Sequence, residues 1–292
     1  MTPMALDAVL TCCRDEEDVI AAFVLFYLDL GFDAVHVVDN GSVDRSADIV
    51  GELIAAGLPV TLQRDGRLGY ERHLTEWFHA AGRRLNPRWL FFLDCDEFIL
   101  LPRSARDWLD ALPPEVNRLT VRQREIYPAP KGSESSHFLL SRRSEPRFND
   151  TTKDVVRYHP DARVYGGKHR IDISDARALC PTDVFIRHYK YRGVVQARRK
   201  EQNRVAAKRV YSDADLARIS ATGIRSARDW IEHCERAAAD EAWRDSFNPM
   251  DSMEDGAMAD WALGFLQRIE RRVPKLSGKG LGTAGRRGGS HS

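Results

Sequence analysis

Short apolar runs and helix-like patterns alternate along the first hundred residues of the chain. The apolar runs are rich in β-branched and aromatic residues and predict strands at 8–10, 34–38, 60–62 and 89–93. Apolar positions at helical spacing lie between these runs and predict helices at 19–30, 44–56 and 70–85. Strands that alternate with helices typically form a mostly parallel central sheet with helices on both faces. The pattern therefore predicts an α/β fold.

The second half of the chain is less regular. Strand-like runs occur at 119–121, 138–140, 155–158 and 184–188. Helical spacing follows and predicts helices at 194–211, 226–234 and 258–269. The end of the chain is Gly-rich and basic and is expected to be disordered. We expect three parts, which are a main domain over 1–192, a helical appendage over 193–274 and a disordered tail over 275–292.

Composition limits the classes of function and partner. The chain has 292 residues, 43% of them hydrophobic and 30% charged, which fits a globular protein with a large core. Its net charge of +1 gives no overall attraction to nucleic acid, so no such partner is expected. No apolar stretch is long enough to span a bilayer, although peripheral membrane contact stays open. Five cysteines without Cys-x-x-Cys spacing indicate reduced thiols and a cytoplasmic location.

Three carboxylates follow the apolar strand predicted at 89–93, namely Asp94, Asp96 and Glu97. Open α/β sheets bind ligands outside the carboxyl ends of their strands. Neighbouring carboxylates repel one another unless a cation lies between them. Oxygen ligands suit Mg²⁺ or Mn²⁺, which also bind phosphate oxygens. The stretch therefore favours a metal–diphosphate site over an acidic turn that caps the next helix.

Polar residues also follow the first two predicted strands. The first turn, 11–16, contains no glycine, which argues against a dinucleotide site of the Gly-x-Gly-x-x-Gly type. In the second turn, Asp39 ends a β-branched strand, and its carboxylate would accept hydrogen bonds from a ribose or a base. The alternative is an Asx turn in which Asn40 and Gly41 only shape the backbone. The spacing leaves both interpretations open.

Three motifs occur in order over this half of the chain. They are Arg-Asp-Glu-Glu at 14–17, Val-Val-Asp-Asn-Gly-Ser-Val-Asp at 37–44 and Phe-Leu-Asp-Cys-Asp-Glu-Phe at 92–98. Together they resemble glycosyltransferase family 2, in particular the branch with the sequences DNGSxD and LDxDEF. The resemblance implies a GT-A fold over 1–192, a nucleotide-sugar donor, and Mn²⁺ or Mg²⁺ held by the Asp-x-Asp motif.

The resemblance also implies roles for single residues of this sequence. The positions expected to bind the nucleotide sugar are Thr11, Glu16, Asp39, Arg72 and Asp94. Thr11 and Glu16 belong to the first nucleotide-binding turn, and Asp39 lies where the family contacts the base or ribose. Asp96 is expected to bind the metal together with Asp94.

The second half adds histidines and cations to this picture. It resembles the C-terminal half of the same branch in a Lys-x-x-Val-Arg strand and a later His-Tyr pair. The resemblance makes His188 a third metal ligand, with His169 as a second candidate; the alternative is a histidine that only hydrogen-bonds at a sheet edge. Cations that would neutralise a leaving diphosphate, or else form a solvated basic face, are Lys153, Arg157, Lys168 and Arg170.

The resemblance and the motifs predict a metal-dependent glycosyltransferase. It would move a sugar from a nucleotide-sugar donor to a hydroxyl of a carbohydrate or glycoconjugate acceptor, with inversion in one displacement, for example in surface polysaccharide synthesis. Inversion needs a carboxylate base near the acceptor, and the candidates by position are Glu125, Glu134 and Asp150. One alternative is a phosphatase or phosphotransferase of the haloacid-dehalogenase kind, which also uses Asp-x-Asp after a strand. Another is a non-catalytic sugar-binding module, which needs no metal at Asp96.

Overall fold

A computed structural model gives the structure of residues 6–127, 143–144 and 151–190, and of residues 192, 196, 198–200, 202, 203 and 206. The candidate bases Glu134 and Asp150 lie outside the described residues. So do the strand predicted at 138–140, the helices predicted at 226–234 and 258–269, and the tail. The division into three parts therefore stays a prediction.

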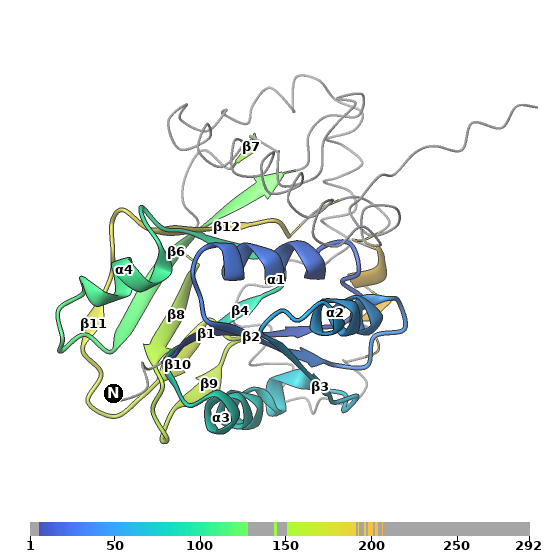
Figure 1. Cartoon of the computed structure of the whole chain (residues 1–292), viewed down its shortest axis with the longest axis horizontal. Coiled ribbons are helices and arrows are strands. Elements are labelled where there is room, and N and C mark those ends of the chain that lie inside the picture. The colour runs from blue at the N-terminus through green and yellow to red at the C-terminus, as the bar shows by residue number, and fades with distance from the viewer. Residues whose placement is uncertain are drawn as a thin grey trace, which may run out of the picture.

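The first half of the chain forms the predicted alternation of strands and helices (Figure 1). Its elements are β1 (Leu6–Cys13), α1 (Ile20–Asp29), β2 (Ala34–Asp39), α2 (Ser46–Ala55), β3 (Val60–Arg64), α3 (Leu74–Leu85) and β4 (Pro87–Asp94). The four strands are parallel and lie in the order β3-β2-β1-β4. The α/β fold predicted from the apolar pattern is confirmed.

Helices cover both faces of these strands, and β4 shows why. Its side chains alternate between two separate hydrophobic clusters, because successive residues of a strand point to opposite faces. Phe91 packs in the cluster of α1 and α2, whereas Phe92 packs in that of α3 with Trp77 and Phe78. Every side chain from Trp89 to Leu93 is fully buried. A strand covered on both faces reads as a continuous apolar run, which is the pattern seen in the sequence.

Local structure refines the sequence prediction in three places. The helix predicted over 70–85 is a 3₁₀ turn, η1 (Tyr70–Arg72), followed by α3. The acidic stretch caps no helix, because β5 (Glu97–Leu100) follows Asp96 directly. A short helix that the pattern did not predict, α4 (Ala105–Asp110), begins at Ser104, whose hydroxyl accepts a hydrogen bond from the Asp107 amide. None of the described helices has the length and apolar character needed to cross a membrane.

The second half adds mixed strands to the same sheet. Its elements are β6 (Arg118–Tyr127), β7 (Arg143–Ser144), β8 (Thr152–Arg157), β9 (Arg163–Tyr165), β10 (Arg170–Asp172), β11 (Ala178–Leu179) and β12 (Phe185–His188). The main path of the sheet runs β3-β2-β1-β4-β8-β6-β12-β5, with β7 and β11 also paired to β6. β8 is antiparallel to β4 and β6, and β12 lies between β6 and β5. β9 and β10 form a separate hairpin.

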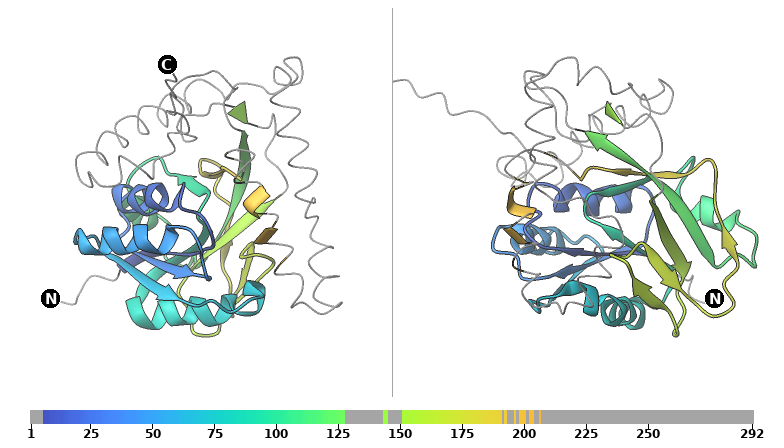
Figure 2. Two further views of the ribbon diagram at one scale, coloured as in Figure 1. Left: turned by 90° about the vertical axis from the view of Figure 1, so that its right-hand side faces the viewer. Right: turned by 180° about the vertical axis from the view of Figure 1, so that it is seen from behind.

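This path requires the sheet to curl. Three strands separate β4 from β5, so a flat sheet would hold the two about 19 Å apart, at roughly 4.8 Å per strand. The chain from Asp94 to Glu97 spans at most about 11 Å. The sheet therefore bends until β5 returns to the end of β4, and in Figure 2 the green strand β6 runs at a steep angle to the blue strands of the first half. The curl brings residues of β8, β6 and β12 to the acidic turn.

Candidate active site

Strand register places the predicted nucleotide and metal residues at one edge of the sheet. β1 lies between β2 and β4, with Cys13 opposite Asp39 and Cys12 opposite Asp94. On the other arm of the curled sheet, β12 lies between β5 and β6, and His188 is opposite both Glu97 and Glu125. The carboxyl ends of the parallel strands and the turn between β4 and β5 thus form one site.

Asp94 is held by two buried lysines. The Nζ of Lys153 lies 2.8 Å from Asp94 Oδ2 and 2.9 Å from Glu97 Oε1. Lys168, in a left-handed conformation with φ of 70°, binds Asp94 Oδ1 and donates a hydrogen bond to the Cys12 thiol. The side chains of the two lysines are 0% and 2% exposed, whereas that of Asp94 is 32% exposed.

These lysines fix the charge of Asp94. Burial by itself raises the pKa of this carboxyl, but the ammonium groups of Lys153 and Lys168 outweigh burial and hold the pKa well below its usual range. Both oxygens of the ionised Asp94 are therefore engaged by buried ammonium groups. This arrangement favours Asp94 as an anchor that orients the lysines.

Asp96 is the centre of a second group. Its side chain is 4% exposed, and its Oδ1 lies 3.4 Å from the Nε2 of His188. The other ring nitrogen of His188, Nδ1, lies 3.0 Å from Glu125 Oε1. Asp96 also accepts a hydrogen bond on its backbone oxygen from the Tyr189 amide, at 2.8 Å. The imidazole thus lies between two carboxylates that come from different arms of the curled sheet.

The two carboxylates set the protonation of His188. Burial by itself lowers the pKa of the imidazole, but attraction to Glu125 and Asp96 outweighs burial and raises the pKa to about 10. His169 behaves in the opposite way, because burial and nearby Lys153 lower its pKa to about 3. His188 is therefore a cation at neutral pH, whereas His169 is neutral and binds the Thr152 carbonyl through Nδ1, at 2.9 Å.

This difference predicts a pH dependence of stability. Because the pKa of His188 is higher in the folded than in the unfolded protein, where it is about 6.5, its contribution is complete below pH 6.5 and is lost as pH rises toward 10. We expect His188→Gln to lower the free energy of unfolding by on the order of 2–4 kcal/mol at pH 6, measured by urea unfolding in EDTA. This gap between wild type and variant should shrink toward pH 10. His169→Gln is the control, because the folded pKa of His169 is depressed to about 3 and its effect on stability is therefore constant once pH is well above the unfolded pKa of about 6.5. A constant gap for His188→Gln would contradict the ion-pair assignment.

The first strand–helix turn adds further carboxylates to the site. Glu16 is paired with Arg192, and its Oε1 lies 3.3 Å from Lys200 Nζ. Arg192 also holds Asp18 through Nε at 2.7 Å and Nη2 at 3.0 Å, and its Nη1 lies 3.5 Å from Asp96 Oδ2. The basic residues after β12 therefore join the first turn to the Asp-x-Asp turn.

The other predicted nucleotide residues lie in different surroundings. Thr11 is fully buried, and its hydroxyl lies 3.1 Å from the Cys95 sulfur, inside the sheet. Asp39 is 4% exposed and accepts a hydrogen bond from the Ser42 amide at 3.2 Å, which is the Asx-turn arrangement. Arg72 is exposed on η1. Roles for these three residues in nucleotide binding stay predictions.

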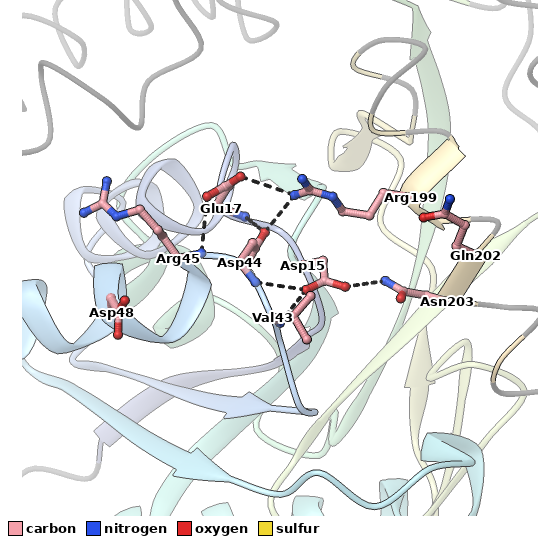
Figure 3. A pocket seen from close by; sticks show the side chains of 9 residues that line it. All are labelled: Asp15, Glu17, Val43, Asp44, Arg45, Asp48, Arg199, Gln202 and Asn203. Atoms are coloured by element: carbon pink, nitrogen blue, oxygen red, sulfur yellow. Dashed lines mark hydrogen bonds and ion pairs between the residues drawn. The ribbon is translucent and has the colours of Figure 1, made fainter.

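A hollow of about 490 Å³ opens beside this site, next to the first turn (Figure 3). Figure 3 shows Arg199 reaching Glu17 and Asp44 across it, and Asn203 reaching Asp15. The hollow is lined by polar and charged side chains, among them the carboxylates of Asp15 and Asp44, but by none of Asp94, Asp96 and Glu125. The chemistry is therefore better placed at the turn between β4 and β5.

The side chains at the acidic turn match the needs of a divalent metal only in part. The described residues include no group of three or more His, Cys, Asp or Glu side chains arranged to hold a metal ion. Asp96 and His188 form a suitable pair once the imidazolium gives up its Nε2 proton to solvent, since His188 directs that nitrogen to Asp96 and the other to a carboxylate that orients the ring. Further ligands would have to come from a bound diphosphate or water. Asp94, engaged by two lysines, fits this role less well.

The chain is similar to several solved structures. No family model and no curated protein matches the chain. Among solved structures, TarS 1–349 of S. aureus with UDP-GlcNAc is 14% identical, covers 94% of this chain and 84% of its own, and has a TM-score of 0.41. GalNAc-T7 with UDP, GalNAc and Mn²⁺ is 11% identical. The match covers 81% of this chain and 58% of the GalNAc-T7 chain, with a TM-score of 0.42.

A third structure is glucosyl-3-phosphoglycerate synthase of Mycobacterium tuberculosis with Mn²⁺, UDP and glucosyl-3-phosphoglycerate. It is 18% identical. The match covers 41% of this chain and 44% of the synthase chain, with a TM-score of 0.29. The chain thus spans less than two thirds of this structure and of GalNAc-T7. All three are GT-A glycosyltransferases, the class predicted from the motifs. At TM-scores of this size we draw no functional assignment from the likeness.

Proposed function

We propose that the chain is a metal-dependent glycosyltransferase of GT-A type that moves a sugar from a nucleotide-sugar donor to an acceptor hydroxyl, with inversion. The observation that carries the proposal is the group formed by Asp96, His188 and Glu125 at the edge of the sheet where Asp39 also lies. An acidic turn at the carboxyl end of a parallel strand, next to a carboxylate-oriented histidine, supports a cation–diphosphate site.

The metal is assigned to Asp96 and His188, with Glu125 as the residue that orients the imidazole. When bound, Mn²⁺ or Mg²⁺ supplies positive charge for the diphosphate that leaves with the nucleoside. Asp94 instead holds Lys153 and Lys168 in place, and these lysines keep positive charge next to the same turn. We therefore propose a positioning role for Asp94, and its role as a metal ligand stays a prediction.

The donor and acceptor sides are assigned by position. The nucleoside would lie over the first turn and the Asp39 turn, where Asp39 offers a second carboxylate oxygen to a ribose or base. The acceptor hydroxyl would attack the anomeric carbon and pass its proton to a carboxylate base. The contact between Glu125 and His188 favours an orienting role for Glu125, so the base is sought at Glu134 or Asp150.

The haloacid-dehalogenase alternative needs a nucleophilic aspartate at the end of the first strand. Asp94 ends β4, not the first strand, and both of its oxygens are held by lysines. It therefore does not match the position of that nucleophile. The sugar-binding module is the remaining alternative, and it differs from an enzyme in needing no metal for sugar binding.

The test of the proposal is a screen of nucleotide sugars with and without Mn²⁺. UDP-GlcNAc and UDP-GalNAc are the first probes, since UDP compounds occur in the solved structures named above. Release of nucleoside diphosphate is measured with a panel of sugar acceptors, and binding is measured by calorimetry. Mn²⁺-dependent release supports the proposal. Release of inorganic phosphate from a generic phosphate ester, or metal-independent sugar binding without turnover, would overturn it.

Asp39 gives a prediction for the nucleotide. We expect Asp39→Ala to weaken binding of UDP by about tenfold or more, because a recognition site built on hydrogen bonds loses much of its affinity with one partner. Loss of the hydrogen bond from the Ser42 amide costs about 1 kcal/mol of stability. Asp39→Asn, which keeps that acceptor, separates the two effects. Unchanged UDP affinity in both variants would leave Asp39 as a turn residue.

A further inference from the structure

Lys200 lies at the carboxylate to which the metal is assigned. Its Nζ is 2.5 Å from Asp96 Oδ2, while His188 faces Oδ1 of the same group. The side chain of Lys200 is 29% exposed. The metal position of Asp96 is thus next to a cation of the protein itself.

The lysines at Asp94 differ from Lys200 in burial. Lys153 and Lys168 are 0% and 2% exposed, and displacing either from Asp94 would strip a fully buried ammonium of a carboxylate, which is strongly unfavourable even though Lys153 keeps Glu97. The Lys200 side chain is partly exposed, and it also has a second carboxylate, Glu16, at 3.3 Å. Exchange of one cation for another is therefore feasible at Asp96 and not at Asp94.

We infer that Lys200 fills the cation position of Asp96 in the metal-free protein, and that a divalent ion binds by displacing it. Lys200 thereby sets the affinity of the site for metal. The inference rests on the proposed function, since it takes Asp96 as a metal ligand.

The physical basis is competition for one carboxylate. An ammonium at 2.5 Å from Oδ2 repels an incoming divalent ion and occupies the oxygen that would bind it. Arg192 adds to this effect more weakly, because its Nη1 is 3.5 Å from the same oxygen and its main partners are Glu16 and Asp18. Without Lys200, Asp96 keeps its charge, and the main cation that competes with the metal for this carboxylate is gone.

The test is Mn²⁺ binding by calorimetry to the full chain after treatment with EDTA. Lys200→Met keeps the length of the side chain and removes its charge. Arg199→Met is the matched control, because Arg199 is the neighbouring cation and pairs with Glu17 and Asp44, not with Asp96. We expect Lys200→Met to bind Mn²⁺ about tenfold more tightly than the wild type, and Arg199→Met to stay within about twofold.

The outcomes separate the inference from the proposed function. Equal or weaker Mn²⁺ affinity in Lys200→Met, while Asp96→Asn loses binding, would overturn the inference and leave the metal site standing. Absence of Mn²⁺ binding to all variants, with and without UDP, would overturn both. Lys200→Gln serves as a second neutral variant if Lys200→Met does not fold, as judged by circular dichroism.

Discussion

Replacing Asp96 by Asn is expected to lower the affinity for Mn²⁺ by about 100-fold or more, and Mn²⁺-dependent binding of UDP with it. Loss of an outer partner of a metal ligand already costs about 10–100-fold, and Asp96 is assigned as a direct ligand. Its side chain is only 4% exposed, and it is the carboxylate that faces Nε2 of His188. Calorimetry with Mn²⁺ and UDP measures the effect.

The control for this variant is Asp161→Asn, which makes the same chemical change at an exposed carboxylate bound to His159. It is expected to leave Mn²⁺ affinity unchanged. Thermal unfolding of Asp96→Asn shows whether the fold survives, which we expect, since Glu16, Asp18 and Glu125 still balance the neighbouring cations. Mn²⁺ affinity near that of the wild type in Asp96→Asn would refute the metal assignment.

Replacing Lys153 by Met is expected to give the largest loss of stability, about 3–5 kcal/mol, because it leaves the fully buried Glu97 beside the Asp94 carboxylate without their shared cation. The Nζ of Lys153 lies between Asp94 and Glu97, and the side chain is fully buried. Urea unfolding at pH 7 measures the loss. Arg170→Met, at an exposed cation paired with Asp172, is the control and should change stability by less than about 0.5 kcal/mol.

A second change tests the cause of this loss. Glu97→Gln in the Lys153→Met background removes one of the two charges and is expected to recover part of the stability, as measured in a double-mutant cycle. Burial raises the pKa of Glu97, so in Lys153→Met the folded protein takes up a proton as pH falls. The stability deficit of Lys153→Met relative to the wild type should therefore shrink as pH falls from 7 to 5. An additive cycle and a deficit independent of pH would point to lost packing instead of unpaired charge.

Much of the parallel half could be predicted from the sequence, because its signals are local. The continuous apolar run of β4 and the carboxylates that follow it depend only on neighbouring residues. The same holds for Asp39 at the end of β2. A turn residue and a ligand-binding residue share one local pattern, so the sequence left the role of Asp39 open, and its bond to the Ser42 amide shows only that the turn forms.

Prediction was poorer where the outcome depends on partners distant in the chain. The sequence placed Glu125 among the candidate bases, yet its contact with His188 joins strands 63 positions apart. Asp94 as a metal ligand stays a prediction, but no local pattern indicated that Lys153 and Lys168 hold both of its oxygens. Short strands such as β9 to β11 carry too few residues for a periodic signal, and their pairing is set by the surrounding sheet.

The sequence by itself determined the alternation of strands and helices and the position of acidic groups at strand ends, since hydrophobic periodicity acts over a few residues. Only the tertiary structure decided which charges meet. The two-residue turn between β4 and β5 forces the sheet to curl, and the curl places His188 against Asp96 and Lys153 against Asp94. Buried ion pairs form only when both partners leave water together, and that condition is met by the closed sheet and not by any segment alone.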